Sequence, residues 1–126
     1  MNENDIGTII IETAIDIHRK LGPGLLETVY ETILFHGLVQ KKLHVQKQMP
    51  IPILFEGIEF EEGFRADLVV ENKVIIELKS VEKVANIHKK QLLTYLKLSK
   101  MKLGYLINFN EELLKNGIKR IINGKL

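Results

Sequence analysis

The stretch that most constrains this chain runs over residues 63–79, GFRADLVVENKVIIELK. Two runs rich in β-branched and aromatic residues, 64–70 and 74–78, flank a polar tripeptide at 71–73. Apolar runs of this length and composition, separated by a short polar segment, are typical of a β-hairpin. We therefore predict two adjacent antiparallel strands joined by a tight turn.

The acidic residues within this hairpin depend on its register. Glu77 and Lys79 are two positions apart, so their side chains are expected to project from the same face of the sheet. A three-residue turn at 71–73 would bring Asp67 opposite Glu77 on that face, whereas a two-residue turn would place Asp67 on the other face. The sequence favours the three-residue turn, which makes Asp67 and Glu77 cross-strand neighbours.

Two opposed carboxylates repel each other unless a positive charge lies between them. A hard divalent cation meets this need, since Mg²⁺ prefers oxygen ligands and is often held by one or two carboxylates together with phosphate oxygens. Lys79 could then orient the attacking water or offset charge on a phosphoryl transition state. The alternative is a solvated strand face with an ordinary Glu–Lys pair, because surface ion pairs are common and weak.

The pattern of Asp67 followed by Glu77-x-Lys79 resembles the PD-(D/E)xK nuclease superfamily. Alanine stands at position 66, where the superfamily pattern has proline, and that position does not touch the ligands. The pattern is short, so further blocks are needed to support it.

Three further blocks follow in the expected order along the chain. HRKLGPG at 18–24 leads into GLLETVY at 24–30, which matches the signature of the small GxxExxY protein family. GFRAD at 63–67, followed by Gln-x-x-x-Tyr at 91–95, looks like the RecB-type branch of the superfamily. Together the blocks cover nearly the whole chain.

This resemblance implies a metal-dependent nuclease site. The implied ligands of Mg²⁺ or Mn²⁺ are Glu27, Asp67, Glu77 and the main-chain carbonyl of Leu78. The implied catalytic residues are Glu27, Asp67, Glu77 and Lys79, with Lys79 positioning the attacking water. The implied substrate-binding residues are Gln91, Tyr95, Tyr30 and Arg65.

Several of these residues also have ordinary structural explanations. Glu27 falls in the first turn of an expected helix, where a carboxylate stabilises the positive end of the helix dipole, and Glu31 is the second choice for the acid that reaches the metal. Tyr30 could hold a carboxylate or a phosphate oxygen, or it could be a half-buried aromatic residue. Gln91 and Tyr95 share a helix face that either contacts phosphate or is plain surface.

Hydrophobic periodicity extends the prediction to the whole fold. The expected helices cover residues 5–21, 25–41 and 86–99, and the expected strands lie within 43–60, 64–70, 74–78 and 102–108. Residues 118–122 form a last strand or a short helix, and the strand is favoured. Pro50 and Pro52 indicate that the first strand region is an edge strand or irregular. This order predicts an α/β fold, a sandwich with a mixed β-sheet flanked by helices, and it agrees with the restriction-endonuclease-like core that the resemblance implies.

Length and composition narrow the class of protein. At 126 residues the chain is expected to form one domain over residues 1–126. It contains no cysteine, which excludes disulfides, thiolate zinc sites and cysteine nucleophiles. No apolar run approaches the roughly 20 residues that cross a bilayer, and the first residues are acidic, so we expect a cytoplasmic protein with no membrane partner.

The charge balance limits the kinds of partner that the chain can bind. With 18 basic and 16 acidic residues the net charge is +2, so nucleic acid would bind locally rather than over the whole surface. The leading hypothesis is a Mg²⁺- or Mn²⁺-dependent nuclease acting on nucleic acid, with DNA favoured. The alternative is a catalytically silent nucleic-acid-binding or assembly module, because fold does not determine function. A homo-oligomer is compatible with the sequence.

Overall fold

The computed structural model describes residues 1–126, apart from the side chain of Glu62. The elements are α1 (Glu3–Leu21), α2 (Glu27–Gln40), β1 (Val45–Phe55), β2 (Ile58–Val70), β3 (Val74–Lys79), α3 (Asn86–Ser99), β4 (Leu103–Asn108), the 3-10 helix η1 (Leu114–Gly117) and β5 (Ile118–Ile122). The sequence therefore predicted the order of helices and strands correctly. None of the helices in this described part of the chain has the length and apolar character of a membrane span.

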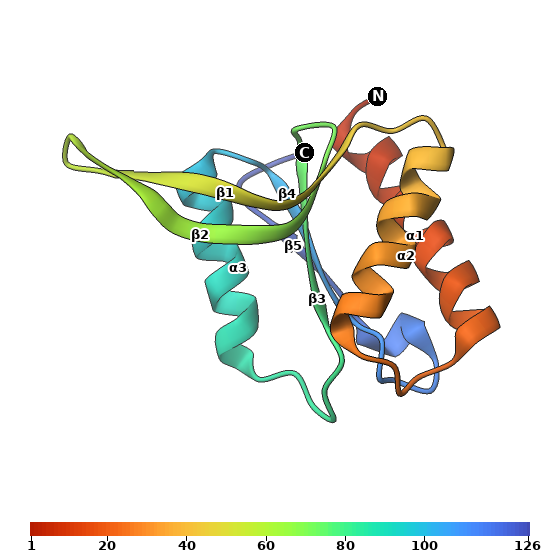
Figure 1. Cartoon of the computed structure of the whole chain (residues 1–126). Helices are drawn as coiled ribbons and strands as arrows, with labels where there is room; N and C mark the ends of the chain where they lie inside the picture. The colour runs from red at the N-terminus through yellow and green to blue at the C-terminus, as the bar shows by residue number, and fades with distance from the viewer.

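The five strands form one mixed sheet in the order β1-β2-β3-β4-β5. The neighbours β3 and β4 are parallel, and the other neighbouring pairs are antiparallel. The helices α1 and α2 lie on one side of the sheet, and α3, which connects β3 to β4, lies on the other (Figure 1). The predicted α/β sandwich with a mixed sheet is therefore confirmed.

Two apolar cores lie on the two faces of the sheet, and β3 contributes to both. Ile76 and Leu78 pack in the core beneath α1 and α2, whereas Ile75 packs in the core beneath α3. Because side chains alternate along a strand, Glu77 and Lys79 project to the α3 side. Burial of each large apolar side chain contributes about 1.5–3 kcal/mol, so this alternation fixes which face carries the polar residues.

The first helix begins two residues earlier than the sequence predicted. Its start is capped by Asn2, whose Oδ1 accepts a hydrogen bond from the Asp5 backbone N–H at 2.8 Å, while the Asn2 N–H donates to Asp5 Oδ2 at 3.2 Å. This reciprocal pairing satisfies backbone donors that the helix itself leaves free. The helix ends at Leu21 and is followed by the capping residue Gly22, whose φ of 74° is a positive value that glycine adopts readily.

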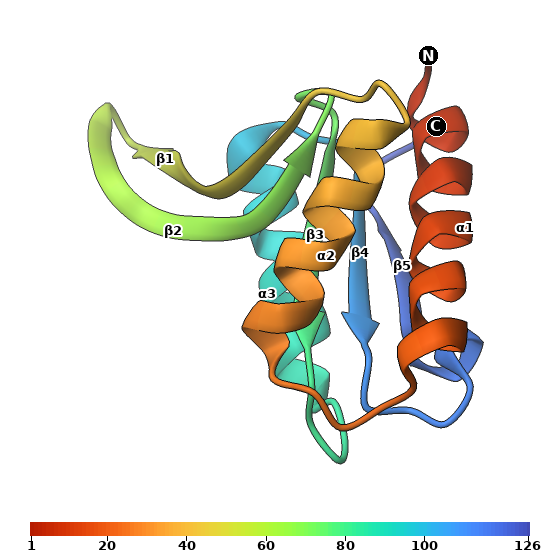
Figure 2. The same ribbon diagram turned by 45° about the vertical axis from the view of Figure 1, so that its right-hand side comes forward.

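The strand β1 is an edge strand, as its two prolines predicted. It pairs only with β2 in the sheet order, and an edge strand tolerates proline because one side of its backbone has no neighbour. The β1–β2 hairpin extends well beyond the body of the molecule and curves strongly (Figure 2). Its base, not its tip, lies beside α2 and carries the polar side chains described below.

Candidate active site

The β2–β3 hairpin has the three-residue turn that the sequence predicted. Val70 lies opposite Val74, and the ladder of paired residues continues to Leu68 and Ile76. Beyond this pair, the side chain of Asp67, rather than its backbone, meets the neighbouring strand. The prediction that the turn has three residues is therefore confirmed.

The Asp67 carboxylate binds the backbone of β3 directly. Its Oδ2 accepts a hydrogen bond from the Leu78 N–H at 2.8 Å. The N–H and C=O of one strand residue point to the same side, so the Leu78 carbonyl also faces the Asp67 side of β3. The next carbonyl, that of Lys79, points the other way and accepts a hydrogen bond from the Phe109 N–H at 2.9 Å. The implied main-chain ligand thus lies on the same side of β3 as Asp67.

Glu77 lies largely buried beside Asp67. Burial, the negative charge of Asp67 and a hydrogen bond between the two carboxyl groups together raise the pKa of Glu77 to about 9, against a lowering effect of Lys79. Among the described residues, Glu77 Oε1 is buried without a hydrogen-bond partner. A buried oxygen without a donor costs about 1–3 kcal/mol, so this pair favours a bound proton or cation.

Glu27 is the first residue of α2 and lies half-buried at the same site. Burial raises the pKa of Glu27, the charge of Lys79 lowers it, that of Asp67 raises it, and a hydrogen bond with the Ser80 backbone lowers it. The hydrogen bond with the Ser80 backbone places the Glu27 carboxylate near the end of β3. Glu27 can therefore stabilise the start of α2 and also belong to the acidic cluster.

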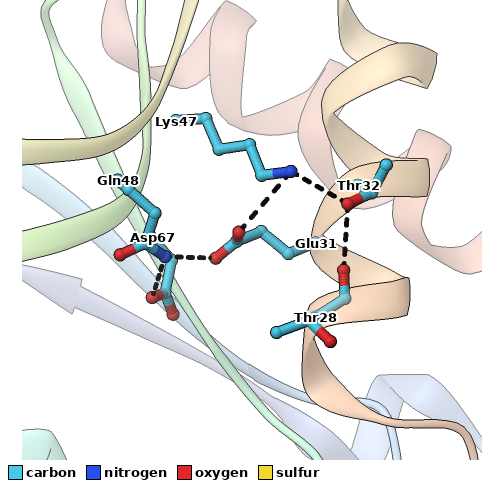
Figure 3. Close-up of polar contacts among 6 residues, drawn as sticks. All are labelled: Thr28, Glu31, Thr32, Lys47, Gln48 and Asp67. Carbon is cyan, nitrogen blue, oxygen red and sulfur yellow. Dashed lines mark hydrogen bonds and ion pairs between the residues drawn. The ribbon is translucent and has the colours of Figure 1, made fainter.

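Glu31, one turn further along α2, joins the cluster through β1. Its side chain is buried, and Gln48 Nε2 donates to Glu31 Oε1 at 2.6 Å and to Asp67 Oδ1 at 3.2 Å (Figure 3). Lys47 Nζ lies 4.0 Å from Glu31 Oε2 and donates to Thr32 Oγ1 at 2.9 Å. Burial raises the pKa of Glu31, and the Gln48 hydrogen bond lowers it. An amide and an ammonium group of β1 therefore stabilise this buried acid.

A small polar pocket lies between the sheet and α3. Its polar lining consists of Arg65, Glu77, Lys79, His88, Gln91 and Tyr95. The pocket therefore brings three of the predicted substrate-binding residues next to two of the predicted catalytic residues. His88, to which the sequence assigned no chemistry, also lines it.

Tyr95 is held firmly in this pocket. Its ring stacks on Phe64, with the ring centroids 3.6 Å apart. Burial raises the pKa of Tyr95, and the charge of Glu77 raises it further, so the phenol keeps its proton at neutral pH. Tyr95 can therefore act as a hydrogen-bond donor toward an anionic group in the pocket.

Tyr30 does not lie in the pocket, and the expectation that it contacts substrate is wrong. Its side chain is fully buried, and its ring stacks on Phe109 with the ring centroids 4.4 Å apart. The hydroxyl donates to the Gly22 carbonyl at 2.6 Å and accepts from the Leu25 N–H at 3.2 Å. Tyr30 instead ties the loop between α1 and α2 to the core.

The donor set suits a hard divalent cation by its chemistry, because it offers carboxylate oxygens and a carbonyl and includes a buried oxygen without a partner. However, no group of three or more His, Cys, Asp or Glu side chains in the described part of the chain is arranged to hold a metal ion. The carboxylates of Glu27, Asp67 and Glu77 are therefore close neighbours, but they are not already arranged as a complete metal site. Mg²⁺ does not require one, since it is usually bound by one or two carboxylates with water and phosphate oxygens.

Sequence reasoning missed Lys47 and Gln48. Gln48 lies 19 residues before Asp67, in an edge strand whose local pattern carries no sign of chemistry. These residues reach the site because β1 pairs with β2, with Lys47 opposite Leu68, and that pairing is not visible in local periodicity. In the sequence, the only indication of a role for this strand was the presence of polar residues in an otherwise apolar edge strand.

Comparison with known proteins gives one match. A family model described as the PD-(D/E)XK nuclease superfamily matches residues 4–121, which include every site residue named above. No curated protein and no solved structure matches the chain. The finer resemblances, to the GxxExxY family and to the RecB-type branch, stay predictions.

Proposed function

Since the chain belongs to the PD-(D/E)XK nuclease superfamily, we propose that it is a metal-dependent nuclease that hydrolyses the phosphodiester bonds of DNA. The observation that carries this proposal is the contact between Asp67 and the buried Glu77, whose pKa is raised to about 9 and whose Oε1 has no partner among the described residues. Two neighbouring carboxyl groups in this arrangement favour the binding of a positive charge. Lys79 follows Glu77 by two residues and lies on the same face of the strand.

The oxygen-only donor set supports Mg²⁺ or Mn²⁺ as the cofactor. Asp67, Glu77 and the Leu78 carbonyl would hold the ion, and Glu27 would reach it directly or through water. When bound, the ion would supply Lewis acidity that activates water and offsets negative charge on the phosphate.

The chain's own residues would do the remaining work. Lys79 lines the pocket beside Glu77, where its ammonium group would orient the attacking water and balance charge that develops on the phosphate. Gln91 and Tyr95 offer an amide and a protonated phenol on the same wall, which would fix the scissile phosphate. Arg65 Nη1 donates a hydrogen bond to the Gln48 carbonyl at 3.3 Å. The other N–H groups of the guanidinium would be donors for a neighbouring phosphate.

A cleavage assay tests this function. The purified chain should cut DNA fragments when Mn²⁺ or Mg²⁺ is added and not in the presence of a chelator. Asp67→Ala and Lys79→Ala should abolish cleavage while their circular dichroism spectra stay unchanged. Asp16→Ala and Lys102→Ala, at exposed positions away from the site, are the matched controls and should cut normally. Site variants that cut as well as the parent chain would end the nuclease proposal.

A second candidate is a catalytically silent nucleic-acid-binding or assembly module on the same fold. The observation that favours it is that, in the described part of the chain, no three acidic or histidine side chains are arranged to hold a metal. Calorimetry with Mn²⁺ beside the cleavage assay separates the two functions. Metal binding with cleavage supports the nuclease, whereas nucleic acid bound without metal or cleavage supports the module. RNA and DNA of the same sequence should be compared in both assays.

A further inference from the structure

The side-chain amide of Gln48 joins two acids that would otherwise repel each other. Its NH₂ group has two hydrogens, and Nε2 lies 2.6 Å from Glu31 Oε1 and 3.2 Å from Asp67 Oδ1 (Figure 3). Only the NH₂ end of the amide can face two carboxylates, because the amide oxygen would be repelled by both. The bridge therefore fixes where the two carboxylates lie relative to each other.

The backbone of Gln48 has a left-handed conformation, which directs its side chain into this bridge. Its φ is 52°, a left-handed value that few residues other than glycine adopt and that costs on the order of 1 kcal/mol or more. Arg65 Nη1 donates to the Gln48 carbonyl at 3.3 Å, which helps to hold this conformation from β2. Strained backbone of this kind persists where the surrounding structure needs the resulting side-chain direction. Here that direction is from the edge strand toward α2 and Asp67.

The two acids of α2 face different partners. Glu31 is only 6% exposed, and its two oxygens face Gln48 and Lys47 of β1. Glu27 instead faces Lys79 and the Ser80 backbone at the end of β3. Glu31 is therefore placed to hold Gln48, whereas Glu27 is placed to face the proposed metal and phosphate.

The Asp67 carboxylate is held at both oxygens. Gln48 donates to Oδ1 and the Leu78 backbone N–H donates to Oδ2, so the rotation of the carboxylate is fixed. Each oxygen keeps a second lone pair for another partner.

We propose that Gln48 and Glu31 are a positioning pair: Gln48 holds the Asp67 carboxylate in the orientation that ligates the metal, and Glu31 holds Gln48. The pair rests on the proposed function, since a metal is what Asp67 is held for. Neither residue is a ligand itself. Removing such a partner of a metal ligand typically lowers metal affinity 10- to 100-fold.

Calorimetric titration of the whole chain with Mn²⁺ tests the pair. Gln48→Gly removes the amide but allows the left-handed backbone without strain, so it should lose less thermal stability than Gln48→Ala while its Mn²⁺ affinity falls at least about tenfold. Gln48→Ala should lose the same affinity and keep the strain. Gln40→Ala, at the exposed end of α2, removes an amide away from the site and should change nothing.

Glu31→Gln tests the role of the buried acid. Its amide oxygen can still accept the Gln48 hydrogen bond, so a positioning role predicts an affinity within about threefold of the parent chain, whereas Glu31→Ala should lose about as much as Gln48→Gly. A loss in Glu31→Gln as large as that in Asp67→Ala would make Glu31 a ligand and overturn the pair.

The outcomes separate this inference from the function on which it rests. A parent chain that binds Mn²⁺, together with Gln48→Gly that binds it equally well, would overturn the positioning role and leave the metal site standing. A parent chain that binds no Mn²⁺ would overturn the proposed function and, with it, the purpose of the pair. Equal losses of Mn²⁺ affinity in Gln48→Gly and Gln48→Ala, with different thermal midpoints, would support the pair, because a purely structural role would make the affinity follow the stability.

Discussion

Raising the pH of the metal-free chain from 5 to 8 is expected to destabilise it, because Glu77 holds a proton in the folded state. The pKa of Glu77 is raised from its ordinary 4.5 to about 9 by burial and by the adjacent Asp67. The folded state therefore binds this proton more tightly than the unfolded state. The resulting stability is complete below about pH 4.5 and is lost as the pH rises through about 9.

The size of the effect follows from the length of that interval. Each pH unit between the two pKa values changes the unfolding free energy by up to 1.36 kcal/mol, so three units correspond to at most about 4 kcal/mol. A domain of this size is typically stable by about 5–15 kcal/mol, so the change is easily measured. Burial also raises the pKa values of Glu27 and Glu31, which act in the same direction, so a variant is needed to isolate Glu77.

Glu77→Gln supplies that comparison. Glutamine is close in shape to protonated glutamate and cannot ionise, so the variant should lose most of the pH dependence and should be more stable than the parent chain at pH 8. Urea unfolding at pH 5 and pH 8 in a chelator measures both free energies. Glu112→Gln, an exposed substitution, is the control and should follow the parent chain. Parallel pH dependences for the parent chain and Glu77→Gln would refute the account of a buried, protonated acid.

Three further predictions concern the metal, the core and the pocket. Mn²⁺ should raise the thermal midpoint strongly at pH 8 and little at pH 5, because protons compete with the ion for the same oxygens; equal shifts at both pH values in thermal scans would contradict this. Tyr30→Phe should lower the unfolding free energy by about 1–2 kcal/mol, because it removes two buried hydrogen bonds, and calorimetry should find Mn²⁺ binding intact. Gln91→Ala should raise KM for DNA more than it lowers kcat in steady-state cleavage, and the opposite pattern would exclude a role in binding the phosphate.

Local features of the fold could be predicted from the sequence. The hairpin followed from strand alternation and from the polar tripeptide 71–73, both of which are encoded within a few residues. Its register then brought Asp67 to the end of β3, as expected. The edge position of β1 followed from Pro50 and Pro52, because proline is disfavoured in a central strand.

Contacts between distant segments could not be predicted. Gln48 reaches Asp67 because β1 pairs with β2, and its left-handed backbone is not typical of glutamine. Tyr30 was expected at the site because it follows Glu27 by three positions. Its hydroxyl instead donates a hydrogen bond to the Gly22 carbonyl in the preceding loop. Its burial depends on the packing of α2 against the sheet, which periodicity does not specify to a single residue.

The most direct test of the central claim is a crystal structure of the chain grown or soaked with Mn²⁺, with the ion located by its anomalous scattering. The account predicts one strong peak bound by carboxylate oxygens of Asp67 and Glu77 and by the Leu78 carbonyl, at distances close to the roughly 2.0–2.1 Å typical of Mg²⁺ sites. A structure with Mn²⁺ bound elsewhere, or with none between Asp67 and Glu77 at saturating concentration, would contradict it.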